Sequence, residues 1–497
     1  MRRAPIVGIL AIAALARFWA IDFCLPSTLC RPDEEAVAAI STYFFTRNFN
    51  PHFFDWPSFF MYEVSVALIP LFKVGLWLGW YRGEKHFVEM MRLDPAPVFL
   101  TARLLSAIAG VATVWVVYRI GKILPGTGNR EPGTNSGETV GLIAALFLAL
   151  AFLHARDSHF GVTDITATLL VAISFLFTIR KDVVWAAVFA GLATATKYNS
   201  VLICLPLLIS VIKSPRRIAI VAGVMFAAFF VASPFVVIDY TNALKAFDQI
   251  SDHLRGGHGV ALGRGWSYQL STSLRYGLGL PLLIAGIAGL AVAAVRSPRQ
   301  GLLMAVFPIT YYLSIGAGYT VFARYILPVV PFLCLTAAIG VDEIASWRGL
   351  PSTSLRPGKP SPSIPAFAIP WRATAAFGFA QAALAVAIIL PSAWSIIQFD
   401  ALLARTDSRV MVEDWVQQRF PDGAVIGQML RMSNRLSFVP EVLGQPSKYQ
   451  LMLVDEVQGE PGSRGRAFIA LRSRLSAAAV AGSVDAAISK RVLGECV

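Results

Sequence analysis

The sequence predicts a polytopic α-helical membrane protein with about eleven spans, interfacial helices in its first outer loop and a small C-terminal α/β domain. Two properties of the chain predict this class. Of its 497 residues, 56% are hydrophobic and only 15% are charged, whereas a soluble domain carries roughly 25% charged residues. Apolar runs long enough to cross a bilayer, or nearly so, also follow one another along most of the chain.

The basic residues are distributed like those of a membrane protein. A net charge of +13 is compatible with nucleic-acid binding. Here, however, the basic residues cluster in short loops between apolar runs, which is the positive-inside pattern of membrane proteins. We therefore expect membrane lipids, and no nucleic acid, among the partners.

The first apolar run follows Met1-Arg2-Arg3, as in a signal peptide. No small-residue cleavage site follows it, so we interpret it as a retained signal-anchor helix. The expected spans begin near residues 5, 98, 139, 164, 183, 199, 217, 280, 300, 322 and 372.

Residues 57–81 form a further apolar run, which Glu63, Pro70 and Lys73 interrupt. If this run lies along the interface, the N-terminus is inside, the C-terminus is outside, and the basic clusters of six successive loops fall inside. If it crosses, every basic cluster after the first moves outside. We therefore predict that it does not cross. The same count requires two short spans within residues 183–212, with a turn near Lys197.

The chain changes character near residue 399, where charged residues return and apolar runs shorten. We expect a transmembrane domain over residues 1–398 and a small α/β domain on the outer side over residues 399–497. Residues 408–420 show helical spacing, and residues 449–454 and 467–471 are typical of strands.

Three consecutive carboxylates follow the first expected span, directly after Pro32. Acidic residues at a membrane boundary are costly unless they face water, pair or have a function. Asp33 or Glu34 could therefore act as a general base. The alternative is a solvated carboxylate that caps the next helix.

The second expected outer loop, residues 154–164, holds two His, one Arg and two Asp. Asp157 and His159 could be acid/base residues or metal ligands, although their spacing matches no known metal cage. The alternative is a hydrogen-bonded cluster that closes a helical hairpin. Apart from a divalent metal, which stays open, no cofactor is expected.

Cations are also expected at the outer ends of the spans. Lys197, Arg264 and Arg324 could bind a phosphate, and the alternative is snorkelling to lipid headgroups. Elsewhere, Cys24 and Cys30 could pair on an oxidising face.

Four ordered motifs complete the pattern that begins with the acidic residues at 33–34. They are NPHFFDWPS (residues 50–58), HARDSHFGVTD (154–164), GLATATKYN (191–199) and ARYILPVVPFL (323–333). Together they resemble the GT-C superfamily of integral membrane glycosyltransferases, in particular the protein mannosyltransferases and the bacterial lipid A aminoarabinose transferases. The resemblance covers roughly residues 1–340.

The resemblance implies a polyprenyl-phosphate sugar as donor, and we expect catalysis on the outer face of a bacterial inner membrane. The family's base maps onto Asp33, with Glu34 beside it. Its Arg-Asp element maps onto Arg156-Asp157, and the lipid phosphate would face Lys197 and Arg324. We assign Asp33, Glu34 and Asp157 to catalysis and Lys197, Arg324 and Arg264 to the donor phosphate. The acceptor-side or supporting residues are Arg156, His159, Asp164 and His258.

Two departures from the pattern of the protein mannosyltransferases argue against that group. Residues 55–58 replace the HPP element of the protein mannosyltransferases, and residues 399–497 show no β-trefoil repeat. The expected function is an inverting transfer of the sugar to a lipid, glycan or protein acceptor. The alternatives are a transporter or flippase of a lipid-linked or anionic solute, and a non-catalytic assembly subunit.

Overall fold

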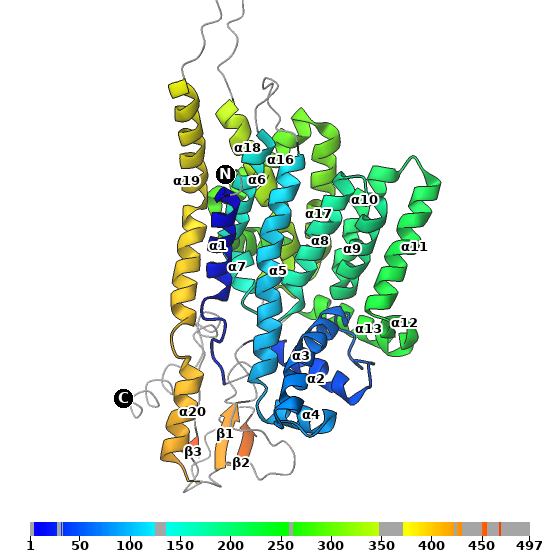
Figure 1. Cartoon of the computed structure of the whole chain (residues 1–497), viewed down its shortest axis with the longest axis vertical. Helices are drawn as coiled ribbons and strands as arrows, with labels where there is room; N and C mark the ends of the chain where they lie inside the picture. Colours follow the sequence, from blue (N-terminus) through cyan, green and yellow to red (C-terminus); the bar gives the residue numbers. More distant parts are fainter. Residues whose placement is uncertain are drawn as a thin grey trace, which may run out of the picture.

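Helices that run alternately up and down between two ends of the molecule make up most of the computed structural model (Figure 1). The structure describes residues 4–26, 31, 33–124, 136–257, 262–346, 371–421, 425–429, 450–454 and 467–468. We call the end that carries Asp33 the outer end and the opposite one the inner end, following the predicted orientation.

Each of the expected spans coincides with a helix, and the predicted class of polytopic helical membrane protein is confirmed. The pair expected within residues 183–212 is present and turns at Lys197, as predicted. These helices are α1 (Ala4–Phe18), α5 (Ala96–Ile123), α6 (Ser136–Ala149), α8 (Thr163–Ile179), α9 (Val183–Thr196), η2 (Tyr198–Ile203) with α10 (Cys204–Val211), α11 (Pro215–Ala232), α16 (Leu280–Arg296), α17 (Pro298–Gly316), η4 (Ala323–Val329) with α18 (Val330–Ser346), and α19 (Trp371–Leu403).

The number of crossings stays a prediction. By length and composition, five of the described helices could cross a membrane, or six if one bent pair counts as a single span. Several others are apolar but only 10–17 residues long. The five include α3 (Phe59–Trp77), which the sequence places along the interface.

The segment 323–344 is central to the bundle, since 94% of its most apolar 18-residue stretch is buried within the protein. Its helix α18 packs closely on α16, where a Cβ on Gly289 would collide with the carbonyl oxygen of Thr336. Small residues permit this close approach between membrane helices. Arg324 lies in η4, directly before α18, so the central position of this segment places Arg324 in the middle of the outer end of the bundle.

The first outer loop folds as a small helical unit against the beginning of α5 (Figure 1). It consists of α2 (Glu34–Tyr43), η1 (Phe44–Thr46), α3 and α4 (Glu84–Leu93). Val37, Phe60 and Phe87 share one buried cluster with Phe99 of α5. With 28 residues, α5 exceeds the ~20 that a span needs, so its first turns extend to this unit.

Both ends of α3 lie at the outer end of the bundle. Before its first turn, the hydroxyl groups of Ser58 and Ser233 are 3.0 Å apart, and Ser233 directly follows α11. Near its last turn, Phe72 contacts Phe87 of the polar helix α4 with a ring-centre distance of 5.2 Å, and α4 leads into α5. A helix with both ends at one face favours the predicted placement along the interface.

The other long outer segment is also helical. Asn50 of the first loop donates a hydrogen bond of 2.9 Å to Asp239 and joins the two outer segments. The elements here are α12 (Phe235–Ile238), α13 (Tyr240–Gly256), α14 (Gly265–Tyr268), the π-helical turn η3 (Gln269–Leu274) and α15 (Arg275–Leu278), while the short α7 (Phe152–Asp157) lies in the second outer loop.

The C-terminal elements agree with the sequence pattern. They are α20 (Ser408–Arg419) and a parallel three-stranded sheet of order β2-β1-β3, with β1 at Val425–Met429, β2 at Gln450–Val454 and β3 at Ala467–Phe468. The predicted boundary between residues 398 and 399 falls inside α19, which continues to Leu403. Whether these elements form a separate outer domain stays a prediction.

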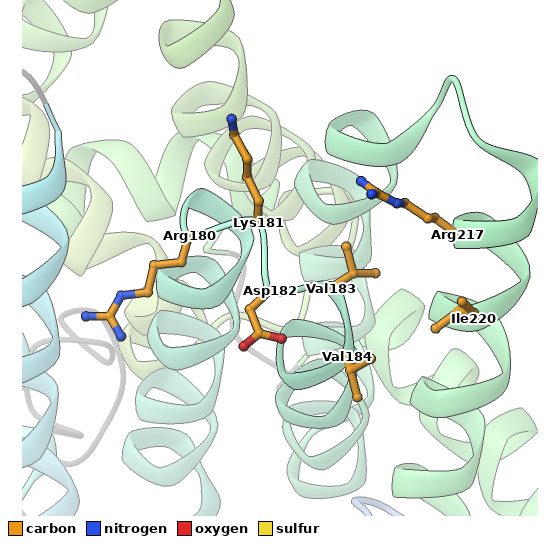
Figure 2. Close-up of a pocket in the computed structure, with 7 residues that line it drawn as sticks. All are labelled: Arg180, Lys181, Asp182, Val183, Val184, Arg217 and Ile220. Atoms are coloured by element: carbon orange, nitrogen blue, oxygen red, sulfur yellow. The ribbon is translucent and has the colours of Figure 1, made fainter.

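One depression of about 500 Å³ lies at the inner end (Figure 2). It is far from the predicted site, because it adjoins the end of α8 and the beginning of α9, whereas Asp164 and Lys197 occupy their opposite ends. Figure 2 shows Arg180 directed away from Arg217, so these cations do not converge on one ligand. The depression is lined by Arg180, Lys181, Asp182, Val183, Val184, Arg217 and Ile220.

Single-cysteine labelling tests the topology. A cysteine at position 90 should react with an impermeant maleimide from the outside, and one at position 130 only after permeabilisation. This follows if α3 lies along the outer face and α5 crosses the membrane. Protection of position 90 from the outside reagent, with reaction from the inside, would show that α3 crosses.

Candidate active site

Asp33 and Arg324, 291 residues apart, form an ion pair at the outer end. Asp33 occupies the N-cap position of α2 with a φ of 78°, a left-handed conformation that Asp tolerates better than most residues. Its carboxylate makes no capping hydrogen bond and instead accepts one from Nη2 of Arg324. The Asp33 side chain keeps 30% of its surface exposed, against 9% for Arg324.

Arg324 continues into a second ion pair. Its Nε lies 3.7 Å from Oδ2 of Asp164, and Asp164 accepts a hydrogen bond from Nζ of Lys197. Asp164 is in the first turn of α8, and Lys197 follows the last turn of α9. The four side chains form a row of alternating charge, Lys197–Asp164–Arg324–Asp33, which we call the charge row.

Aromatic rings hold the two cations of the charge row. Nζ of Lys197 is 5.0 Å from the ring centre of Tyr325. The guanidinium carbon of Arg324 is 4.5 Å from the ring centre of Phe322. Such contacts restrict the side chains and add cation–π attraction, so both positive charges have a fixed position.

Glu34 points away from the charge row and is 2% exposed. Its two carboxylate oxygens accept hydrogen bonds from Arg103 of α5, at 3.0 Å from Nε and 2.7 Å from Nη2. The backbone N–H of Gly161 donates a third, at 2.7 Å. A buried carboxylate with three donors has no access to an acceptor, so this geometry argues against the predicted catalytic role and makes Glu34 an anchor of α2.

Asp157 is also fully buried, at 0% side-chain exposure. Arg156 donates two hydrogen bonds to its Oδ2, at 3.0 Å and 2.7 Å. Arg31 lies on its other side, with Nη2 3.7 Å from Oδ1. The predicted Arg-Asp element is therefore a pair within itself, and the burial of Asp157 argues against its direct role in catalysis.

His159 has a structural position. Its ring nitrogens contact the carbonyl oxygens of Ala155, at 3.0 Å, and Trp19, at 3.1 Å. Burial lowers its pKa to about 4. The neutral imidazole has one N–H, so one of these contacts at a time is a hydrogen bond. This geometry fits the hairpin-closing cluster better than an acid/base or metal-binding role.

Asp55 is a further carboxylate near the charge row, and no sequence pattern singles it out. Burial, and then the negative charge of Asp33, raises its pKa, while His253 acts in the opposite sense. The pKa of Glu35 is raised as well, by burial and by the carboxylates of Asp33 and Glu34. The outer end therefore holds more negative charge than the ion pairs alone show.

The remaining predicted residues lie elsewhere. Arg264 is exposed and donates to the hydroxyl of Tyr319 at 3.3 Å; no contact joins it to the charge row within the part of the chain that is described. His258 lies outside the described residues. Among the residues that the structure describes, no group of three or more His, Cys, Asp or Glu side chains is arranged to hold a metal ion. Cys24 is in a disulfide, and its expected partner, Cys30, is not among the described residues.

Two arginines of this region were missed from the sequence. Arg103 is a charged residue inside an apolar run, and such residues are typically paired or functional. Arg31 directly precedes the acidic string. Both signals were visible, but neither indicates which carboxylate is the partner.

Comparisons with known proteins agree with this fold. The family model of Glycosyltransferase family 87 matches residues 90–317. The crystal structure of ArnT from Cupriavidus metallidurans bound to undecaprenyl phosphate is similar, with a TM-score of 0.56 and 18% identity over 92% of this chain and 87% of that one. Its apo state gives a TM-score of 0.55 and 18% identity over 91% and 86%. No curated protein sequence matches significantly.

The chain therefore shares the fold of ArnT, and the resemblance to membrane glycosyltransferases stated from the sequence is confirmed.

Replacing Glu34 by Ala tests its anchoring role. The change leaves the Arg103 guanidinium buried without its partner, which costs about 3–5 kcal/mol of stability. We expect the free energy of unfolding, measured by denaturant titration of the protein in detergent, to fall by a corresponding amount. Glu35→Ala, one residue on, is the control and should unfold like wild type. A Glu34→Ala protein of wild-type stability that has lost turnover would instead assign Glu34 to catalysis.

Proposed function

We propose that this protein is a membrane glycosyltransferase that transfers a sugar from a polyprenyl-phosphate donor to an acceptor at the outer end of the bundle. The charge row is the observation that carries this proposal. It offers two fixed cations beside a half-buried carboxylate, at the end where the lipid donor's head group would lie. The match to a glycosyltransferase family and the fold shared with ArnT, whose structure holds undecaprenyl phosphate, support it.

The chemistry requires both signs of charge. Breaking the bond between the anomeric carbon and the phosphate oxygen leaves a negative charge on the phosphate, which fixed cations stabilise. Lys197 and Arg324 are proposed for this role. The attacking hydroxyl of the acceptor must lose a proton, and Asp33 is proposed as the base that takes it. A single displacement inverts the anomeric configuration.

The ion pairs suggest an order of events. In the structure, Arg324 pairs with Asp33 and Lys197 pairs with Asp164. The donor phosphodiester carries one negative charge spread over two non-bridging oxygens, so it can engage both cations at once and compete with both carboxylates. When Arg324 turns to the phosphate, the Asp33 carboxylate is released and becomes available to the acceptor. In this scheme donor binding prepares the base.

The proposed setting is a bacterial inner membrane with the site facing the periplasm. The acceptor class, a lipid, a glycan or a protein, follows from none of these contacts. Turnover of the purified protein in detergent with a polyprenyl-phosphate sugar tests the proposal directly. The alternative of a transporter or flippase predicts no product under these conditions.

Lys197→Ala and Arg324→Ala should each weaken the binding of undecaprenyl phosphate. Charge-assisted hydrogen bonds to the phosphate would be lost, at a cost of about 1.5–3 kcal/mol each. Equilibrium binding to the purified variants measures this. Arg47→Gln is the matched control and should bind like wild type, since Arg47 is an exposed arginine of the same outer loop whose ion pair among the described residues is with Glu84. Wild-type affinity in both test variants would remove these residues from the donor site.

Asp33→Asn should lower turnover by roughly 10²–10⁴-fold, the usual contribution of a general base. Donor affinity should be equal to or tighter than wild type, because the amide competes less well than the carboxylate for Arg324. Turnover and donor affinity are measured on the same preparation, with Glu35→Gln of the same helix as the control. Near wild-type turnover would show that another residue is the base, and a collapse of donor binding would show that Asp33 is structural.

A further inference from the structure

Arg31 is a cation beside the charge row whose partners are incomplete. Its Nε is buried and has no hydrogen-bond partner among the described residues. Its closest carboxylate contact, 3.7 Å to Oδ1 of Asp157, is too long for a hydrogen bond. Oδ1 of Asp157 likewise lacks a hydrogen-bond partner in the described part of the chain. The guanidinium is thus held near an anion without being satisfied by it.

The position of Arg31 is nevertheless fixed. Its guanidinium carbon lies 4.0 Å from the ring centre of Phe160, which is stacking distance. The side chain is 23% exposed, so part of it is open to a ligand. A planar, restrained and partly open guanidinium suits a phosphate oxygen better than a mobile surface arginine does.

Arg31 shares its carboxylate with another arginine. In the charge row, two cations face two carboxylates. Next to it, Arg156 and Arg31 both face Asp157, and Arg156 already makes two hydrogen bonds with that carboxylate. Arg31 therefore has no hydrogen-bonded carboxylate among the described residues, and a partly buried charge without a full partner is costly. An incoming oxyanion would reduce this cost.

Arg31 is also close to the proposed phosphate site. Burial lowers its pKa most, and the positive charges of Arg324 and Arg156 lower it further, against the opposing effects of Asp157 and Glu34. The influence of Arg324 indicates that Arg31 lies near the charge row. Three of the four cations here are engaged by carboxylates through hydrogen bonds, and Arg31 is the one that is not.

We propose that Arg31 is a third binding residue for the donor phosphate and engages it before Arg324 leaves Asp33. This inference rests on the proposed function and deepens it. The phosphate would first meet the cation that has no competing hydrogen bond, and the exchange at Arg324 would follow. Arg31 would position the donor and take no part in proton transfer.

The test is equilibrium binding of undecaprenyl phosphate to the full-length protein in detergent, with uncharged undecaprenol as the reference ligand. Arg31→Gln should weaken binding of the phosphate roughly 10- to 150-fold, the equivalent of a charge-assisted hydrogen bond. Arg31→Lys should recover part of the lost affinity, because it keeps the positive charge. The recovery should be incomplete, because the ammonium is a point charge without the planar fork of a guanidinium. Arg47→Gln is the control for the loss of one arginine, and undecaprenol binding should be the same in all variants.

A double variant separates this role from simple neutralisation of Asp157. If Arg31 only balances that carboxylate, Arg31→Gln with Asp157→Asn should regain wild-type affinity for the phosphate, and the inference is then wrong. If Arg31 binds the phosphate, the double variant stays weak.

Two further outcomes overturn different claims. Wild-type affinity in Arg31→Gln, while Lys197→Ala and Arg324→Ala lose binding, overturns the inference and leaves the proposed function standing. A wild-type protein that does not prefer undecaprenyl phosphate to undecaprenol overturns the proposed donor class itself, whatever Arg31 does.

Discussion

The ion pair between Glu34 and Arg103 fixes the geometry on which the outer site depends. Both partners are fully or almost fully buried, and Arg103 also donates to the carbonyl oxygens of Ile21 and Phe23. A buried pair of this kind adds little net stability, but losing one partner is costly, so it specifies one arrangement. It joins the end of the first helix, α2 and α5 at one point. With α2 held there, Asp33 is placed within reach of Arg324.

Two adjacent carboxylates therefore lie in different surroundings. Asp33 and Glu34 follow one another in sequence, yet one points to the charge row and the other into the protein. The left-handed backbone at Asp33 separates their directions. Such conformations often occur at functional sites, where the surroundings maintain them. The positive φ at Asp33 is a property of the backbone, and it directs the side chain toward its ion pair with Arg324.

The sequence predicted the fold class well, because hydrophobicity and loop charge reflect the bilayer directly. The starts of the spans, the turn at Lys197 and the C-terminal helix and strands all agree with their patterns. Spacing alone could not show that Asp33 meets Arg324, since 291 residues separate them; only the family resemblance placed both at one site. Nor could it distinguish Asp33 from Glu34, because that difference depends on which way α2 faces. Arg31 was overlooked because its meaning depends on the partner it lacks.

The same residue types mean different things at the two ends of the bundle. At the inner end, Arg180 and Lys181 follow the end of α8 at the surface, and their side chains diverge (Figure 2). Such cations satisfy the positive-inside pattern and need no specific ligand. At the outer end, Lys197 and Arg324 are mostly buried, lie against aromatic rings and face carboxylates. Removing a cation from water is worthwhile only where an anion compensates. The buried cations, rather than the more numerous exposed ones, therefore mark the place where we propose that the donor phosphate binds.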